Sequence, residues 1–267
     1  AASLAVPAMA QNADLTVIHG VPGLPAPVEV QANGGALFTF DFGDQAGPLS
    51  LPPATYNIDV VLNGTPAISG PITLAAGGDF TAIAHLDAGG SPTLSLFQND
   101  RSALSAAGNS RVDVRHLAEA GPVDIVLLQN GSTFATIPNV SNGNNAIAEI
   151  PAGVYGVEVN AAGTSTTVLA AEVEFEAGRG FQLHAVGVAL QPSFGLLLQR
   201  TELSARVTVI HGIPGLGAPV DVRNNNSNLF SFDFTDVAGP LALLPGGYNL
   251  SVAQGNTTLL SASPTLN

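Results

Sequence analysis

A segment of 59 residues occurs twice in this chain. Residues 16–74 align without a gap with residues 208–266, and 32 of the 59 positions are identical. The opening TVIHGVPGLPAPVEV of the first copy corresponds to TVIHGIPGLGAPVDV in the second. Such similarity at a fixed spacing is typical of homologous modules placed one after another. The chain is therefore predicted to fold as an array of related modules.

A third, more diverged copy lies between these two. Its opening RVDVRHLAEAGPVDIVL begins at Arg111 and places His116 where the other copies have His19 and His211. The tyrosines of three similar hairpin segments recur in the same register; they are Tyr56, Tyr155 and Tyr248. The histidines lie 97 and 95 residues apart, so one repeat is about 95 residues long.

These repeats divide the chain into four parts. We expect an N-terminal leader at 1–11, a first module at 12–101, a diverged second module at 108–200 and a third module at 204–267. The third ends before the positions of the last two strands of its partners. Two explanations stay open: the sequence is a fragment of a longer protein, or another chain donates the strands. The linker at 102–110 is expected to be flexible, and the linker at 201–205 to be short.

The apolar residues of each module alternate with polar ones, which indicates β-strands. Turn pairs such as Asn33-Gly34 and Asn63-Gly64 separate the runs. In the first module we predict strands at 14–19, 27–32, 36–42, 48–51, 55–62, 66–74, 79–86 and 92–98. Short strands at close spacing favour an all-β protein of tandem immunoglobulin-like or transthyretin-like antiparallel β-sandwiches.

The composition of the chain excludes several functions but does not identify one. Seven basic residues, all arginine, face twenty acidic ones, giving a formal charge of -13. We therefore expect no nucleic-acid partner, because that binding needs clustered basic side chains. The chain has no cysteine, which excludes disulfides and thiolate sites.

The first residues suggest export. Ala8-Met9-Ala10 fits an A-x-A cleavage site after a short apolar stretch, as in a secretory signal peptide. No run of 18 apolar residues follows, so no transmembrane segment is expected. The predicted location is extracellular or at the cell surface.

The recurring histidines and aspartates are the candidate site residues. Metal binding is considered for His19 and His211, and calcium binding for Asp41, Asp44, Asp233 and Asp236. A metal ion needs several ligands, but each module has only one histidine at the recurring position. The aspartate pairs do not follow the pattern of a calcium-binding loop. We expect instead a histidine bonded to the turn backbone near Pro22-Gly23, and aspartates that cap their own turns. No cofactor is predicted.

No catalytic constellation stands out. Glu172, Glu174 and Glu176 alternate along one run and read as the solvated side of an edge strand rather than as a glycosidase pair. Motifs for serine hydrolases, phosphate loops and zinc peptidases are absent from the sequence. We therefore predict no enzymatic activity.

The openings VIHGVPGLPAPVEV, VRHLAEAGPVDIV and VIHGIPGLGAPVDV resemble the V-x-H-x-S-P-x-A-P-x-V-D-V signature of the DUF4397 family. The resemblance covers residues 14–267. Gly-Val-Pro-Gly-Leu replaces the usual Ser-Pro-Asp-Ala-Pro of the signature, and the middle copy matches less well. It implies an exported or surface protein of bacteria or archaea, with tandem modules and no established catalysis.

Three functions follow as hypotheses. The first is a structural or adhesive surface protein that binds a protein or carbohydrate and self-associates through sheet edges. The second is a subunit of an extracellular filament, completed by strand donation into the third module. The third, a secreted hydrolase, has the least support in the sequence.

Overall fold

The computed structural model describes residues 11–24, 27–106, 108–203, 205–212, 219–243 and 246–266. All regular elements within these ranges are strands, so the predicted all-β class is confirmed. None of the described residues forms a helix with the length and apolar character needed to span a membrane. The predicted cleavage site at Ala8-Met9-Ala10 lies outside the described residues.

Copy one is a sandwich of two four-stranded sheets. The first sheet has the order β4-β1-β7-β8, and the second has the order β3-β2-β5-β6. Their bounds are β1 (Ala13–His19), β2 (Val28–Ala32), β3 (Gly35–Phe40), β4 (Gln45–Leu51), β5 (Thr55–Leu62), β6 (Thr65–Thr73), β7 (Asp79–Leu86) and β8 (Pro92–Gln98). All neighbours pair antiparallel except β1 and β7, which run parallel.

Copy two repeats this topology strand for strand. Its sheets have the orders β12-β9-β15-β16 and β11-β10-β13-β14, with β9 and β15 parallel. The bounds are β9 (Asn109–Glu119), β10 (Val123–Gln129), β11 (Ser132–Val140), β12 (Asn145–Pro151), β13 (Gly153–Ala161), β14 (Thr167–Phe175), β15 (Arg179–Val188) and β16 (Gly195–Glu202).

Copy three forms the β19-β18-β22-β23 sheet, the β17-β20 pair and the small β21-β24 pair. The bounds are β17 (Ala205–Ile210), β18 (Val220–Asn224), β19 (Ser227–Phe232), β20 (Val237–Leu243), β21 (Gly246–Gly247), β22 (Leu250–Gln254), β23 (Thr257–Ala262) and β24 (Thr265–Leu266). No parallel partner of β17 lies within the described residues.

The histidine register proposed from the repeat is confirmed by the backbone. In each copy, the amide of the recurring histidine donates to the carbonyl of the residue just before the fourth strand, and the histidine carbonyl accepts from the amide one residue earlier. The pairs involve Asp44 and Gly43 for His19, Asn144 and Gly143 for His116, and Asp236 and Thr235 for His211. The three copies therefore share one framework at this corner.

The eight strands predicted for copy one are found within a few residues of their expected bounds. One predicted strand is too long: β3 ends at Phe40, and Phe42 lies beyond it and is 38% exposed. The Asn33-Gly34 turn has φ values of 50° and 78°, the left-handed conformation that a tight hairpin requires.

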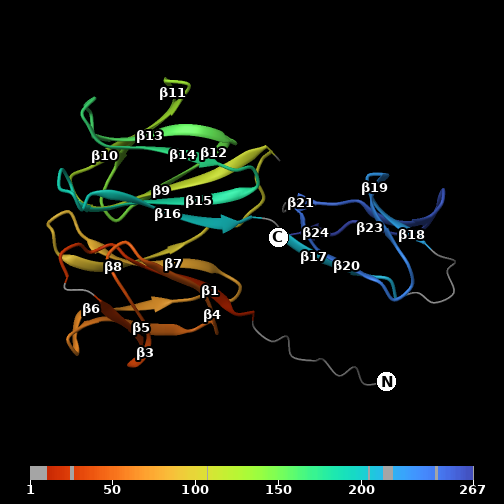
Figure 1. Ribbon diagram of the computed structural model, residues 1–267, viewed down its shortest axis with the longest axis horizontal. Coiled ribbons are helices and arrows are strands. Elements are labelled where there is room, and N and C mark those ends of the chain that lie inside the picture. Colours follow the sequence, from red (N-terminus) through yellow and green to blue (C-terminus); the bar gives the residue numbers. More distant parts are fainter. Residues whose placement is uncertain are drawn as a thin grey trace.

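Each sandwich has its own core, and a further cluster lies between copies one and two. Leu15 and Val17 of β1 point into the core of copy one. Ile18, on the opposite face of the same strand, packs with Ile83, Leu117 and Val186. Figure 1 shows the β1-β7-β8 sheet of copy one stacked on the β9-β15-β16 sheet of copy two.

The linker between copies one and two is anchored, contrary to the predicted flexibility. Arg111 is buried and donates to the carbonyls of Asp100 and Ser102 at 3.0 and 2.9 Å. It also forms an ion pair with Glu149 at 3.0 Å, and Glu149 accepts from the Ser105 amide at 2.8 Å. These bonds pair backbone groups of Asp100, Ser102 and Ser105 and hold the start of the linker against copy two.

Candidate functional site

The stacked sheets of copies one and two enclose the most unusual set of side chains in the described structure. The apolar part is the cluster of Ile18, Ile83, Leu117 and Val186, all at most 1% exposed, flanked by Phe97 and Leu197. A conventional sandwich would expose this side of each sheet to water. Here both outer faces are removed from water, so the two copies form one packed unit.

Arg115 extends from copy two across this interface. Its Nη2 donates to Asp113 Oδ2 and to Asn99 Oδ1, both at 2.6 Å, and its Nε donates to the same Asp113 oxygen at 2.9 Å. The guanidinium carbon lies 4.6 Å from the centre of the Phe97 ring. Arg115 is fully buried, and Nη1 has no protein hydrogen-bond partner. Burial lowers the pKa of Arg115, an effect that Asp113 opposes.

Polar side chains of copy one meet this arginine and its neighbours. Asn99 donates to Asp79 Oδ1 at 2.8 Å, while Thr81 donates to Gln199 Oε1 at 2.8 Å across the interface. Burial raises the pKa of Asp79, and the Asn99 hydrogen bond opposes that change. These hydrogen bonds favour one relative orientation of the two sheets, because slipping would leave Asn99, Thr81 and Gln199 unpaired.

His184 is the least satisfied member of the site. It is completely buried, and neither ring nitrogen has a geometrically acceptable hydrogen-bond partner. Burial, reinforced by the positive charge of Arg115, lowers its pKa to about 3. His184 also pairs in register with Arg115 on the parallel strands β15 and β9. The imidazole is therefore neutral at physiological pH and acts as a packing group.

The same two positions carry different chemistry in the two copies. The parallel pair Ile18–Ile83 of copy one corresponds to Arg115–His184 of copy two. Sequence reasoning missed Arg115 and His184 as site residues, because charged residues alternating with valine suggest a solvated face. The sequence does hold one indication of a buried ion pair. Arg111, Asp113 and Arg115 alternate along one strand, so that opposite charges can pair, in a chain with only seven arginines.

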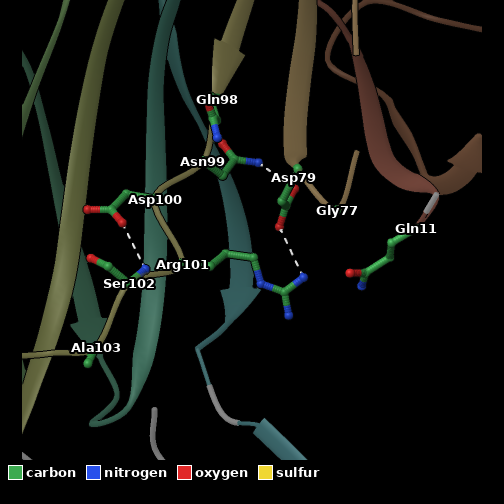
Figure 2. A pocket seen from close by; sticks show the side chains of 10 residues that line it. Gln11, Gly77, Asp79, Gln98, Asn99, Asp100, Arg101, Ser102 and Ala103 are labelled. Carbon is green, nitrogen blue, oxygen red and sulfur yellow. Dashed lines mark hydrogen bonds and ion pairs between the residues drawn. The ribbon is translucent and has the colours of Figure 1, made fainter. Parts of the chain in front are cut away.

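An open pocket of about 770 Å³ lies where the linker leaves copy one. Figure 2 shows Arg101 directed toward Asp79, which also accepts the hydrogen bond from Asn99. The Arg101–Asp79 distance is 3.9 Å, and Arg101 lies 3.8 Å from Asp14. The lining is polar, with Gln11 at the opposite side, so the pocket offers hydrogen-bonding groups rather than an apolar surface.

The recurring histidines lie where the sequence predicts, at the rim of each core. The amide of Val21, next to Pro22, donates to His19 Nδ1 at 3.4 Å, and His116 Nε2 bonds the Gly121 carbonyl at 2.9 Å. His211 packs against Phe232 with ring centres 5.5 Å apart. Burial lowers the pKa of His19 and of His116. These contacts give the rings a structural role.

The candidate aspartates cap their own turns, as predicted. Asp44 Oδ2 accepts from the Asp41 amide at 3.0 Å, and Asp236 Oδ2 accepts from the Asp233 amide at 3.1 Å. Asp41 and Asp44 lie close enough to His19 to act on its charge. Nevertheless, no group of three possible metal ligands is found in the part of the chain that the structure describes.

The three glutamates lie on an edge strand or directly after it. Glu172 and Glu174 are exposed on β14, which is the last strand of its sheet, while Val173 and Phe175 point into the core. Glu176 pairs with Arg179 at 3.1 Å. The alternation matches the predicted solvated edge.

Comparison with known proteins agrees with the repeated opening motif. Residues 13–126 match the sequence model described as "Domain of unknown function (DUF4397)". This part of the chain belongs to the DUF4397 family. The DUF4397 match covers copy one and continues into β10 of copy two. No curated protein matches the chain.

Among solved structures, the chain is similar to one titled "The Bacillus anthracis TIE protein". The sequences are 13% identical and the TM-score is 0.24. The match covers 96% of this chain and 48% of that one, so the present chain spans about half its length.

Proposed function

We propose that this DUF4397 protein is a non-catalytic structural or adhesive component of the cell surface. Copies one and two act together as one stiff element that holds exposed loops away from the cell. The single observation that carries the proposal is the packed interface between these copies, where Arg115 reaches Phe97 and Asn99 of the other module. A surface array that holds its loops away from the cell needs modules that do not bend at their junction.

The anchored linker supports the same role. Arg111 binds the backbone carbonyls of Asp100 and Ser102, so the connection between the modules follows the surface instead of acting as a hinge. The open pocket beside Arg101 and Asp79 is our candidate for the adhesive contact, because carbohydrate hydroxyls suit its amide, carboxylate and guanidinium groups.

The histidines support a non-catalytic role through what they already do. His85 bonds the Leu86 carbonyl at 2.9 Å and the Ser95 hydroxyl at 2.8 Å. His19 and His116 bond turn backbone, and His184 is buried between sheets. Each ring serves packing or a framework hydrogen bond.

Two measurements test the proposal. Protease treatment of intact cells of the source organism should remove the protein from the cell surface, whereas a cytoplasmic marker should survive. Binding of the purified chain to immobilised glycans should weaken in Arg101→Ala, with Arg223→Ala in copy three as a matched loss of charge elsewhere. Protection of the protein in intact cells would contradict the surface role, and equal glycan binding by both variants would contradict the pocket assignment.

A filament subunit is the second candidate, because one observation favours it. The first strands of copies one and two have parallel partners β7 and β15, while β17 has none within the described residues. A strand from another chain would complete the pairing. Electron microscopy of concentrated protein should then show fibres, and a synthetic peptide of residues 79–98 should cap them. Uniform particles without fibres would contradict this candidate.

A further inference from the structure

A second cavity lies where copies one and two meet. Its volume is about 260 Å³, and its walls come from both modules. Copy one contributes Asp14, Thr16, Asp79 and Arg101, and copy two contributes Thr201 and Glu202. We call this space the seam cavity. Asp79 and Arg101 also line the larger pocket that we assign to glycans, so the two cavities adjoin at this pair of residues.

The seam cavity is open because corresponding positions of the two copies carry different residues. By strand register, Asp14 of β1 corresponds to Arg111 of β9, and Glu202 corresponds to Asp100. Arg111 crosses from copy two to copy one and donates to the Asp100 carbonyl at 3.0 Å. Asp14 is shorter and carries a carboxylate instead of a donor. The space that a guanidinium fills beside Asp100 is therefore left as a cavity beside Glu202.

Arg101 lies between the two cavities and can still bind a ligand. Figure 2 shows its side chain reaching from the linker toward Asp79. The guanidinium lies 3.8 Å from Asp14 and 3.9 Å from Asp79, which is longer than a direct hydrogen bond. Its Nη2 donates to the Glu202 carbonyl of copy two at 3.3 Å. Donors of Arg101 and carboxylate oxygens of both aspartates therefore face the cavities with bonding capacity in hand.

We propose that the glycan site continues from the larger pocket into the seam cavity, so that one oligosaccharide contacts both copies. The inference rests on the proposed glycan contact at Arg101 and adds the second half of that site. A single sugar unit would occupy one cavity. A chain of several units would pass Arg101 and reach the wall that Thr201 of copy two provides.

The lining favours an uncharged and unbranched oligosaccharide. Arg101 supplies donors, Asp14 and Asp79 supply acceptors, and Thr16 and Thr201 add hydroxyl groups. A sugar hydroxyl both donates and accepts, so it can bond each of these groups. A polyanionic glycan would be repelled by the two carboxylates and by the formal charge of -13 on the chain. Two adjoining cavities suit a linear chain better than a branched one.

Such a ligand would couple binding to the packing of the modules. A molecule that contacts both copies binds only the packed state, so it stabilises that state by mass action. The coupling is reciprocal, so a change that loosens the interface weakens binding. Gly20 lines neither cavity, and a Cβ there would lie 2.9 Å from Val186 of copy two. Gly20→Ala should therefore weaken oligosaccharide binding through the interface alone.

Isothermal titration calorimetry of the full chain tests the proposal with cellohexaose, maltohexaose and chitohexaose, and with glucose and N-acetylglucosamine as single units. At least one hexasaccharide should bind several-fold more tightly than its single unit. Asp14→Arg places a guanidinium in the seam cavity, as Arg111 does at the corresponding place, and should weaken hexasaccharide binding several-fold. Glu172→Arg makes the same charge change on the exposed edge of β14 and should leave that binding unchanged.

The copy-two wall has its own variant. Thr201→Ala should also weaken hexasaccharide binding several-fold, and circular dichroism checks that each variant is folded. Equal hexasaccharide affinity in wild type, Asp14→Arg and Thr201→Ala would overturn the proposal. If Arg101→Ala still weakened binding in that case, the larger pocket of copy one would be the whole glycan site. Failure of every probe to bind the wild-type chain would contradict the proposed glycan contact itself, and this extension with it.

Discussion

The guanidinium carbon of Arg115 in copy two lies 4.6 Å from the ring centre of Phe97 in copy one. A cation over an aromatic face is attractive, more so when water is excluded. The same guanidinium is paired with Asp113 from its own strand and hydrogen-bonded to Asn99 of the other module. One side chain thus joins the two sandwiches.

Removal of Arg115 should separate or destabilise the pair. In Arg115→Met, Asp113 loses its ion-pair partner in a buried position, and loss of one member of such a pair typically costs about 3–5 kcal/mol. Urea unfolding should show an earlier first transition. Arg179→Ala, which removes partly exposed ion pairs with Glu176 and Glu202, is the control and should change stability by at most about 1 kcal/mol.

The interface residues of copy one should be tolerated at the corresponding positions of copy two. The double variant Asp113→Thr/Arg115→Ile installs the residues found at Thr16 and Ile18, so that no buried charge is left alone. Replacing a buried ion pair with apolar groups is often neutral or stabilising. The double variant should recover most of the stability lost in Arg115→Met. Equal instability of both would show that Arg115 contributes shape rather than charge pairing.

Gly20 should be required for the junction while its counterpart is not. A Cβ at Gly20 would lie 2.9 Å from Val186 Cγ1 and 3.0 Å from the Ala84 carbonyl oxygen, so Gly20→Ala should cost about 1–3 kcal/mol through overpacking. Gly212→Ala has open space and should leave the melting temperature unchanged or slightly higher. Differential scanning calorimetry of the two variants measures both effects. Similar losses in both would contradict the close approach of the modules.

Acid should weaken the junction through His184. Its folded pKa of about 3 lies below the ordinary histidine value of 6.5, so between these values the unfolded chain binds a proton that the folded chain does not. Stability is therefore complete above pH 6.5 and falls as the pH drops, by about 1.4 kcal/mol per pH unit within this window.

His184→Ile, the residue of copy one at this position, should flatten that pH dependence. Burial also lowers the pKa of His19, His85 and His116, which contribute in the same direction in both proteins. The informative quantity is therefore the difference between the unfolding curves of wild type and variant across the pH range. A constant difference would show that His184 is solvated or paired in solution.

Arg111 should protect the linker from proteolysis. Its bonds to Asp100, Ser102 and Glu149 anchor a segment rich in alanine and serine. In Arg111→Ala, elastase should cut within residues 102–106 several-fold faster than in wild type. Arg200→Ala is the matched control, and equal rates in all three proteins would show that the linker is open even when Arg111 is present.

The sequence alone determined the modules. Alternation in a run such as Leu15, Thr16 and Val17 sets a strand and its core face, because side chains on a strand point to opposite sides. Turn pairs such as Asn33-Gly34 fix the hairpins, since few residues adopt the left-handed backbone they need. The repeat places the same histidine corner in all three copies and the turn-capping aspartates in copies one and three.

Only the tertiary structure decided what becomes of the outer faces. Local sequence does not distinguish an outward face that meets water from one that meets another sheet, because Thr, Ile and Arg occur on both. Ile18 and Ile210 have the same neighbours in sequence, yet one is buried and the other is exposed. The difference lies in residues far away in the chain, since Ile83 of β7 and Leu117 and Val186 of copy two pack against Ile18, whereas β17 has no parallel partner within the described residues. The burial of Ile18 therefore depends on residues far away in the sequence, and the pattern of its neighbouring residues cannot predict it.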